Sequence, residues 1–330
     1  MATLASVGEL AFIDAIARLV NARAPRRGVR VGIGDDAAVV VASRATLVTT
    51  DSLIEDVHFR RGWLGPRDVG RRAFRIAVSD IAAMGGVPRY ALLALALPPA
   101  TEAAYARGIV GGLVDDAAAC GTALVGGNVS RSDKISIVVT IIADAIGRPI
   151  LRAGARAGDP IWLTGPVGAA AAGIELLESG ATAGSLVAAY RRPPLRLDVA
   201  AALARRRVVS AMIDVSDGVV HDLRHVCEAS GVTASLDVEA LPMTAVLRRA
   251  AGMLVRPIAD YALYGGDDYE LLLTTRPRAD VTEIAALCQA RGGMLSRVGV
   301  ITRRGDTHLV VDARGHPLES RGYEHFRSKK

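Results

Sequence analysis

The sequence predicts a protein of mixed α and β class with two domains. Its 330 residues correspond to about two domains of average size. Apolar runs rich in β-branched residues alternate with segments of helical spacing in both halves of the chain. The segment Gly147-Arg148-Pro149 interrupts this alternation near the middle. We therefore expect domains at 1–147 and 148–330.

Each half of the chain contributes its own set of elements. In the first half we predict helices at 8–20, 67–84 and 101–119, and strands at 31–41, 46–50, 92–97 and 135–146. Pro66 and Asp68 near the start of the second helix, and Gly85-Gly86 at its end, are typical helix-terminus signals. In the second half we predict helices at 168–178, 195–205, 217–229 and 280–291, and strands at 160–164, 208–215, 234–238, 270–275, 297–301 and 308–312.

Composition excludes several classes of protein. The chain is 51% hydrophobic and 22% charged, as in ordinary globular proteins. No apolar run approaches the roughly 20 residues of a membrane-spanning helix. The acids Glu9 and Asp14 replace the basic start of a secretory signal peptide, so we expect a cytoplasmic protein. Cys120, Cys227 and Cys288 match neither a disulfide framework nor a metal knuckle, and we interpret them as small buried hydrophobic residues.

The basic charge comes almost entirely from arginine. The net charge is +6, and only Lys134, Lys329 and Lys330 among the 40 basic residues are lysines. The arginines are scattered, and few aromatic residues accompany them, so we do not expect nucleic acid as a partner. The lysine scarcity also excludes the GxxxxGK[ST] phosphate loop and the VAIK-type kinase lysine.

Carboxylates follow several of the apolar segments. The acids that do so are Asp35-Asp36, Asp51, Asp80, Asp214, Asp217, Asp267-Asp268 and Glu270. Open α/β folds bind ligands at strand ends, and facing carboxylates repel one another unless a cation neutralises them. Mg²⁺ prefers oxygen ligands and bridges carboxylates to phosphates. The alternative is that each Asp forms a turn or caps a helix, and the spacing leaves both interpretations open.

Other motifs carry less weight. His221 and His225 have the i, i+4 spacing that can chelate zinc. They lack an HExxH pattern and a third ligand, which favours a solvent-facing pair. The glycine-rich segment 158–173 lacks the GxGxxG spacing of a dinucleotide site, and the chain has no GxSxG elbow and no Cys/His nucleophile signature.

Taken in order, eight segments resemble the thiamine-monophosphate kinases, of the superfamily that includes the aminoimidazole ribonucleotide synthetases. They are GIGDDAAVV (32–40), TTDSLIEDVHF (49–59), VSDIAAMGG (78–86), VGGNVS (125–130), GDPIWLTGPVG (158–168), IDVSDGVVHDL (213–223), YGGDDYEL (264–271) and RGYEHF (321–326). A single segment would be weak, but the set spans nearly the whole chain in the family's order.

The resemblance implies a fold and a reaction. The fold is α+β with the PurM-like two-domain architecture: an N-terminal α+β domain whose mixed sheet pairs in a homodimer, and a C-terminal α/β domain. The N-terminal domain would bind metal and ATP, and the C-terminal domain would complete the ATP and substrate sites. ATP would phosphorylate thiamine monophosphate to thiamine diphosphate by direct in-line transfer, with several Mg²⁺ ions and no general base. Neither nucleic acid nor a membrane is an expected partner.

The resemblance also implies roles for individual residues. Mg²⁺ would be held by Asp36, Thr49, Thr50, Asp51, Asp80, Asn128, Asp214 and Asp217, with help from Asp35. ATP would contact Gly127, Asn128, Arg152, Ser216 and Tyr105, and thiamine monophosphate would contact His58, Glu270 and Tyr323. The sequence departs from the family in two places, since Asn128 stands where some members have Asp and Asp267 where others have Glu.

Rival functions can be separated by the same segments. A synthetase that activates an amide should lack the DVHF and GYEHF segments, which this chain has. Selenophosphate synthesis needs a reactive Cys near the N-terminus, whereas the first cysteine is Cys120. A hydrogenase-maturation protein would end in a cysteine, but this sequence ends in Lys330. A catalytically silent binding protein is disfavoured by the retained acids.

Overall fold

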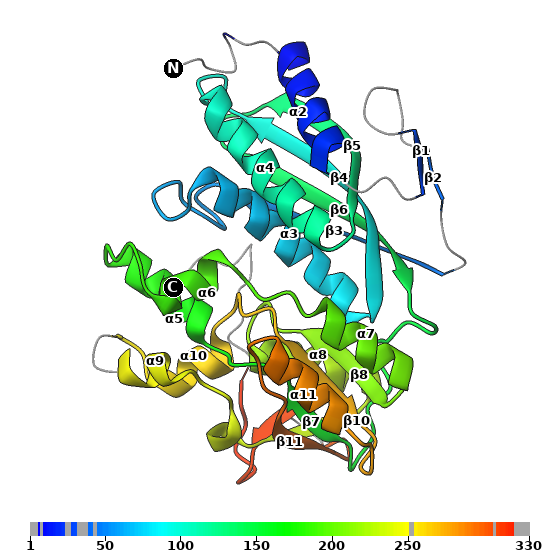
Figure 1. Cartoon of the computed structure of the whole chain (residues 1–330). Coiled ribbons are helices and arrows are strands. Elements are labelled where there is room, and N and C mark those ends of the chain that lie inside the picture. The colour runs from blue at the N-terminus through cyan, green and yellow to red at the C-terminus, as the bar shows by residue number, and fades with distance from the viewer. Residues whose placement is uncertain are drawn as a thin grey trace. The chain divides into compact units, whose positions relative to one another are not determined.

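The chain folds into two compact units (Figure 1). The computed structural model describes residues 6, 9–23, 28–31, 39–41, 45–250, 254–305 and 308–319. The first unit comprises Met1–Ile81 and Gly86–Ala145, and the second comprises Ala82–Gly85 and Ile146–Lys330. The division after Ala145 lies close to the expected boundary at Gly147. Ala82 and Ala83 join the second unit because they pack there against Val199 and Leu203.

The first unit is built on a mixed four-stranded sheet in the order β3-β6-β4-β5. The β4 and β5 strands run parallel, and the other neighbours are antiparallel. Its elements are α2 (Glu9–Arg23), β1 (Val29–Val31), β2 (Val39–Val40), β3 (Thr46–Ile54), α3 (Pro66–Ala83), β4 (Gly86–Leu97), α4 (Ala103–Ala119), β5 (Ala123–Arg131) and β6 (Ser136–Ala145).

The two faces of this sheet differ in burial. Figure 1 shows α2, α3 and α4 on one face, and α3 meets α4 closely where Gly70 faces the backbone of Ile109. Residues alternate between the faces of a strand, so Leu47 and Leu53 of β3 are buried while Val48 is 65% exposed. The helix-covered face therefore holds the core, and the opposite face of β3 is open.

The second unit is built on a six-stranded sheet in the order β12-β9-β11-β7-β10-β8. All neighbours are antiparallel except β12 and β9. Its strands are β7 (Pro160–Leu163), β8 (Val209–Asp214), β9 (Thr233–Leu236), β10 (Leu271–Thr275), β11 (Ser296–Thr302) and β12 (Val310–Asp312). Its helices are α5 (Ala169–Glu178), α6 (Ser185–Arg191), α7 (Leu197–Arg206), α8 (Val219–Ser230), the 3₁₀ turn η1 (Val238–Ala240), α9 (Ala245–Arg249), α10 (Ile258–Tyr264) and α11 (Thr282–Ala290).

Helices cover both faces of this second sheet. Leu272 of β10 packs with Val219 and Val226 of α8 on one face. Leu271 and Leu273 pack with residues of α7 and α11 on the other face. Because both faces are covered, every residue of β10 is buried, which explains its continuous apolar run.

The structure confirms the mixed class and most of the predicted elements, and it corrects some of them. The predicted strand at 31–41 is two short strands, β1 and β2, on either side of residues 32–38, which lie outside the described residues. The strand β5 and the helices α6, α9 and α10 are not among the predicted elements. Within the part of the chain that the structure describes, none of the helices combines the length and hydropathy needed to cross a membrane.

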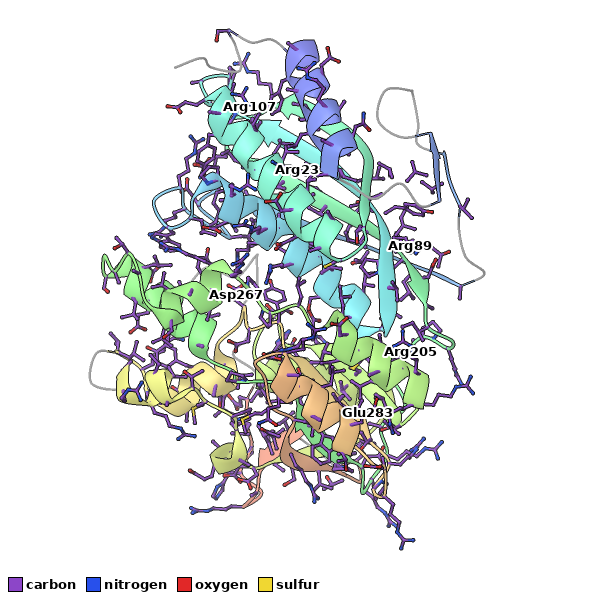
Figure 2. All side chains as sticks on the ribbon, viewed as in Figure 1. Arg23, Arg89, Arg107, Arg205, Asp267 and Glu283 are labelled. Carbon is purple, nitrogen blue, oxygen red and sulfur yellow. The ribbon has the colours of Figure 1, made fainter. Side chains whose placement is uncertain are left out.

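Exposed arginines occur on both units, including Arg23, Arg107 and Arg205 (Figure 2). Several arginines form ion pairs between helices, as Arg23 does with Asp115 at 3.0 Å between α2 and α4. Such partly exposed pairs contribute little stability individually. The positive charge is therefore spread over the surface, as the sequence predicts.

Candidate active site

Three of the predicted metal ligands share one region of the first unit. The hydroxyl of Thr49 donates a hydrogen bond to Oδ2 of Asp80 at 2.6 Å, which links β3 to α3. Asp51 lies two residues after Thr49 on the same face of β3, and its Oδ1 accepts the backbone N–H of Ser52 at 2.6 Å. The structure thus provides a hydroxyl and two carboxylates, all partly exposed.

Thr50 lies on the other face of the same strand. Its hydroxyl is 3.0 Å from the hydroxyl of Thr140 on β6. Because alternate residues of a strand point to opposite faces, the side chain of Thr50 does not reach the face of Thr49 and Asp51. Its carbonyl oxygen is the atom by which Thr50 could serve the predicted metal site.

His58 is held in a turn that follows β3. The backbone N–H of Ile54 donates to Nδ1 of His58 at 3.0 Å, and the N–H of His58 donates to the carbonyl of Ile54 at 2.8 Å. Since Nδ1 is the acceptor, a neutral His58 carries its proton on Nε2. The ring therefore presents a hydrogen-bond donor at Nε2.

Gly127 and Asn128 lie on β5, opposite Leu93 and Ala94 of the parallel strand β4. A side chain at Gly127 would collide with the backbone of Leu93, so this position requires glycine. The two residues line a small cavity of about 100 Å³ whose other walls are mainly apolar, including Ile16. Asn128 brings one amide group to this otherwise apolar wall.

Tyr105 does not line that cavity. Its ring lies under the guanidinium of Arg61, with the guanidinium carbon 5.3 Å from the ring centroid. Arg61 in turn pairs with Glu55 at 2.6 Å in the turn that contains His58. Burial raises the pKa of Tyr105 against the opposing charge of Arg61. Within the first unit, Tyr105 is thus associated with the His58 turn.

In the second unit, the predicted metal ligands Asp214 and Asp217 lie at the end of β8 and on the loop that follows it. Backbone hydrogen bonds continue from the paired strands into this loop. The β8 strand ends at Asp214, which is opposite Leu271 of β10. Beyond the strand end, the backbone N–H of Val215 donates to the carbonyl of Glu270 at 2.8 Å, and the backbone N–H of Asp267 donates to the carbonyl of Ser216 at 2.8 Å. The segments 214–217 and 267–270 therefore hold each other in place.

Asp222 is an acid of this region that is not among the predicted site residues. It is 2% exposed in the first turn of α8, and its Oδ2 accepts the backbone N–H of Asp217 at 3.1 Å. The pKa of Asp222 lies well above its ordinary value because the carboxyl is buried and because Asp217 and Asp214 place like charges nearby. Its position five residues after Asp217 places it in the first turn of α8, but this spacing does not indicate that the side chain is buried.

Arg152 is exposed, and its backbone is anchored between β8 and the end of α8. The carbonyl of Leu151 accepts the N–H of Met212 at 3.0 Å, and the carbonyl of Arg152 accepts the hydroxyl of Ser230 at 3.2 Å. The backbone of Arg152 therefore lies near the end of α8, whereas the loop with Ser216 precedes that helix, and the charge of Arg152 acts on His225 within α8.

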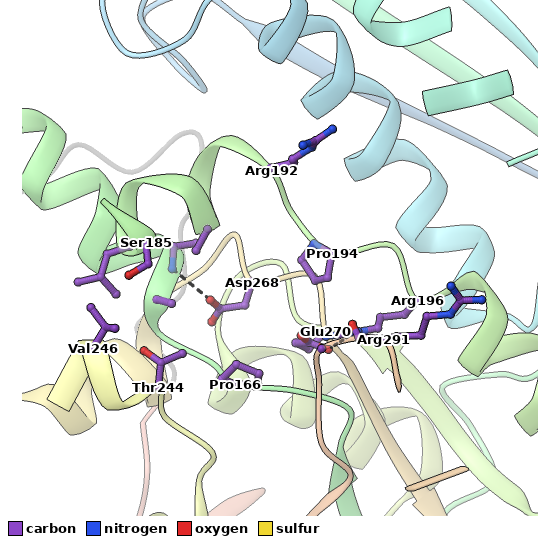
Figure 3. Close-up of a pocket in the computed structure, with 15 residues that line it drawn as sticks. Pro166, Ser185, Arg192, Pro194, Arg196, Thr244, Val246, Asp268, Glu270 and Arg291 are labelled. Atoms are coloured by element: carbon purple, nitrogen blue, oxygen red, sulfur yellow. Dashed lines mark hydrogen bonds and ion pairs between the residues drawn. The ribbon is translucent and has the colours of Figure 1, made fainter. Parts of the chain in front are cut away.

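Glu270, a predicted substrate contact, is 2% exposed and is held by residues of its own unit. Its carboxylate accepts two hydrogen bonds from Arg196, at 2.6 and 2.5 Å, and one from the hydroxyl of Thr164 at 2.7 Å. Figure 3 shows Arg196 and Glu270 facing each other at the wall of a cavity of about 290 Å³. Glu270 is therefore a buried partner of Arg196.

Asp268 is also buried, whereas Asp267 is partly exposed. The carboxylate of Asp268 accepts the N–H groups of Gly168 and Ala170, at 2.6 and 3.3 Å, so it caps α5 from a distant segment. Burial raises its pKa. Asp267 has a left-handed φ of 70° and is labelled on its loop in Figure 2.

The structure leaves part of the predicted site outside the described residues. Asp35 and Asp36 fall between β1 and β2 in the sequence, and Tyr323 falls near the C-terminus, and all three lie outside the described residues. Among the described residues, no three His, Cys, Asp or Glu side chains converge closely enough to hold a metal ion by themselves. The donors that are described form one group in each unit.

The chain matches known families over most of its length. The family models described as AIR synthase related protein, N-terminal domain and C-terminal domain match residues 34–146 and 156–312. Thiamine-monophosphate kinase of Aquifex aeolicus (strain VF5) is 33% identical over 334 residues, covering 98% of this chain and 99% of that protein.

Solved structures agree with these matches. The crystal structure of thiamine-monophosphate kinase from Stenotrophomonas maltophilia K279a has a TM-score of 0.81 and 33% identity, over 94% of this chain and 98% of that chain. AaThiL complexed with AMPPCP and TMP has a TM-score of 0.77 and 32% identity, over 99% of both chains. The two-domain α+β fold expected from the sequence is therefore confirmed.

Proposed function

The chain belongs to the thiamine-monophosphate kinase family, and on this premise we propose direct in-line transfer of the γ-phosphoryl group of ATP to thiamine monophosphate, assisted by several Mg²⁺ ions. Thiamine diphosphate and ADP are the products. The proposed compartment is the cytoplasm, since Cys120, Cys227 and Cys288 are thiols rather than disulfides, which suits reducing conditions.

The observation that carries this proposal is the presence of an acidic group in each unit. Thr49, Asp51 and Asp80 contribute oxygen atoms in the first unit. In the second unit, burial raises the pKa of Asp222, and the like charges of Asp217 and Asp214 raise it further, so these two carboxylates lie close enough to act on Asp222. Both groups would bind polyphosphate only in the company of cations, because a phosphate chain is itself strongly anionic.

The chemistry of these donors fits Mg²⁺. All are carboxylate or hydroxyl oxygens, the ligand type that Mg²⁺ prefers. We propose that Thr49, Asp51 and Asp80 hold Mg²⁺ in the first unit and that Asp214 and Asp217 hold it in the second. Asp36, Asn128 and the carbonyl of Thr50 remain predicted contributors. Bound Mg²⁺ would reduce the repulsion between the two phosphorylated substrates and stabilise the charge of the transferring group.

No side chain needs to act as a general base. The acceptor is a phosphate monoester with a second pKa of about 6, so it is largely dianionic at neutral pH and already nucleophilic. The task of the protein is to bring two anions together in line. This requirement explains why the proposed site consists of oxygen ligands for cations and of hydrogen-bond donors.

The proposed donors to phosphate are His58 and Arg152. Because Nδ1 of His58 accepts the Ile54 N–H, a neutral His58 would donate to the acceptor phosphate from Nε2. Exposed Arg152, whose backbone is anchored by Ser230, supplies positive charge for the phosphates of ATP. Gly127, Asn128, Ser216 and Tyr105 remain predicted ATP contacts.

We propose different roles for Glu270, the acid predicted to contact the cationic thiamine, and for Asp267 on the same loop. Glu270 is engaged by Arg196 and Thr164, so we propose that it positions the loop 267–270 from within the unit. Asp267, which is partly exposed on that loop, would present its carboxylate to the thiazolium. Tyr323 remains a predicted contact of the same substrate.

We further propose that the protein is a homodimer joined through the open face of the first unit's sheet. Val48 is 65% exposed on this face, and Thr50 and Thr140 pair across it. Such a face, apolar and hydroxyl-bearing, is suited to packing against its own copy. Sedimentation equilibrium should give twice the mass of 34.4 kDa, and a monomer at micromolar concentration would refute this part.

The stereochemistry of transfer tests the proposed mechanism. ATP made chiral at the γ-phosphorus with oxygen isotopes is incubated with thiamine monophosphate and Mg²⁺, and the product configuration is determined. A single in-line transfer inverts the configuration. Retention would indicate two transfers through a phosphoenzyme and would overturn direct transfer, while product formation itself would still support the kinase activity.

A further inference from the structure

A histidine pair on α8 lies outside the residues proposed for phosphoryl transfer. His221 and His225 are one helical turn apart, and both are partly exposed. Their Nε2 atoms are 3.2 Å apart, and the two rings meet edge to face with centroids 4.8 Å apart and an interplanar angle of 84°. The two Nε2 atoms therefore face each other at hydrogen-bond distance.

This separation suits a shared metal ion. Zinc binds imidazole nitrogen at about 2.0–2.1 Å, so two ligands at a tetrahedral angle stand about 3.3 Å apart. The same separation also permits a hydrogen bond between the rings, in which one Nε2 carries a proton. A metal ion would replace that bond while the proton moves to Nδ1 of the same ring, with no net change in charge on the two imidazoles.

The surroundings of His225 favour the neutral imidazole, which is the form that binds a metal ion. Its Nδ1 is 3.7 Å from Oε2 of Glu228, and Arg224 holds the other oxygen of Glu228 at 2.8 Å. Metal-binding histidines commonly direct the second ring nitrogen to a carboxylate, which fixes the tautomer. Burial lowers the pKa of His225, as do His221 and Arg152, against the opposing charges of Glu228 and Asp217. Neutral imidazole, the form that binds metals, is thus favoured at neutral pH.

We propose that His221 and His225 form a chelating site for a divalent transition-metal ion, with Zn²⁺ as the representative ligand. The protein supplies two nitrogen ligands and Glu228 behind one of them, and water completes the coordination. This site differs in chemistry from the oxygen donors of Asp214 and Asp217, because Mg²⁺ disfavours imidazole and zinc accepts it. The site lies one turn along α8 from the loop that holds Asp217.

Zinc titration of the full-length, untagged protein tests the proposal. Metal is first removed, and Zn²⁺ is then titrated into the protein in a calorimeter. Excess Mg²⁺ is present throughout so that the proposed carboxylate sites stay occupied by Mg²⁺. We expect one saturable Zn²⁺ site that is weakened at least about tenfold in both His221→Asn and His225→Asn, because each variant removes one arm of the chelate. His316→Gln is the matched control, since His316 lies beside Asp312 in β12 and its replacement should leave zinc binding unchanged.

Copper spectroscopy provides a readout that does not depend on the variants folding. Electron paramagnetic resonance of the wild-type protein with one equivalent of Cu²⁺ should show coupling to two imidazole nitrogens. Coupling to one nitrogen or none would overturn the proposal. Zinc affinity that is unchanged in either single variant would overturn it as well, as would the absence of saturable binding.

Discussion

Two groups of buried acidic residues in the second unit differ in the charges that surround them. Glu270 is surrounded by donors from its own unit, two from Arg196 and one from Thr164. Asp222 is as deeply buried, but Asp214 and Asp217 bring like charges to it. The two groups are close neighbours, because Val215 and Glu270 share a backbone hydrogen bond.

This difference distinguishes acids that stabilise the fold from acids whose charge is neutralised by a proton or a bound cation. A carboxylate with an internal counter-charge is compensated whether or not substrate is present. Carboxylates gathered with one another remain uncompensated until a proton or a cation arrives. Removing a charge should therefore reduce stability in the Glu270 group and reduce activity in the Asp214 group.

The largest expected effect is on turnover in the Asp214 group. Asp214→Asn keeps the size of the side chain and removes a charge from the proposed metal site. We expect kcat to fall by about 10³-fold, as when charge stabilisation of a transition state is lost, with the unfolding midpoint of the metal-free protein equal to or above that of wild type. Steady-state kinetics and urea denaturation measure the two quantities.

A near-normal kcat for Asp214→Asn would remove this residue from the metal site. Asp80→Asn tests the corresponding group of the first unit in the same way. Comparable losses in the two variants would support the assignment of metal ligands to both units.

The next effect is on stability in the Glu270 group. Arg196→Met leaves the buried Glu270 without its guanidinium, and we expect a loss of about 3–5 kcal/mol in the free energy of unfolding. The double variant Arg196→Met with Glu270→Leu should recover most of this loss, because it removes the unpaired charge together with its partner. A loss below about 1 kcal/mol in the single variant would contradict the structural role of this pair.

A smaller effect concerns substrate affinity. Asp267→Asn removes the charge proposed to meet thiazolium, and His58→Asn removes the donor proposed for the acceptor phosphate. Each should raise the KM for thiamine monophosphate about tenfold, the value of roughly one charge-assisted hydrogen bond, while the KM for ATP stays unchanged. An unchanged KM for thiamine monophosphate would exclude the residue concerned from the acceptor site.

The smallest effect is a pH dependence of stability. Because the folded pKa of Asp222 is raised above its ordinary value of 3.8, the folded protein binds the proton more tightly than the unfolded chain. Its contribution is present below that value and is lost as the pH rises toward the folded pKa. Metal-free wild type should therefore lose stability relative to Asp222→Asn as the pH rises above about 4.

Denaturation of both proteins in a chelator, from pH 4 to pH 8, measures this difference. Asp268 also has a raised pKa, but it is present in both proteins and cancels. Parallel stability curves would contradict the repulsion inferred around Asp222.

Periodicity predicted the elements whose side chains carry strong patterns. The β-branched run of β6 and the amphipathic spacing of α3 are examples, and both were placed within one residue of their observed ends. The β5 strand was missed because Gly126, Gly127 and Asn128 have low strand propensity. Its conformation depends on the backbone of β4, which lies beside it only after folding.

The candidate site was predictable by residue type and less so by role. Asp214 and Asp217 could be recognised from the segment that contains them. Glu270 and Asp267 belong to one segment and look equivalent in sequence, yet only the fold brings Arg196 to Glu270. Asp222 carried no signal of burial, since the charges that act on it come from a loop that folds back to the helix.

The central claim is that this chain forms thiamine diphosphate and that the acids of the second unit are needed for it. Phosphorus NMR of a mixture of ATP, Mg²⁺, thiamine monophosphate and the protein measures this most directly. We expect a diphosphate ester to appear with ADP, to be abolished by a chelator, and to be absent with Asp214→Asn. ATP consumption without the diphosphate ester, or full activity in the chelator, would contradict the claim.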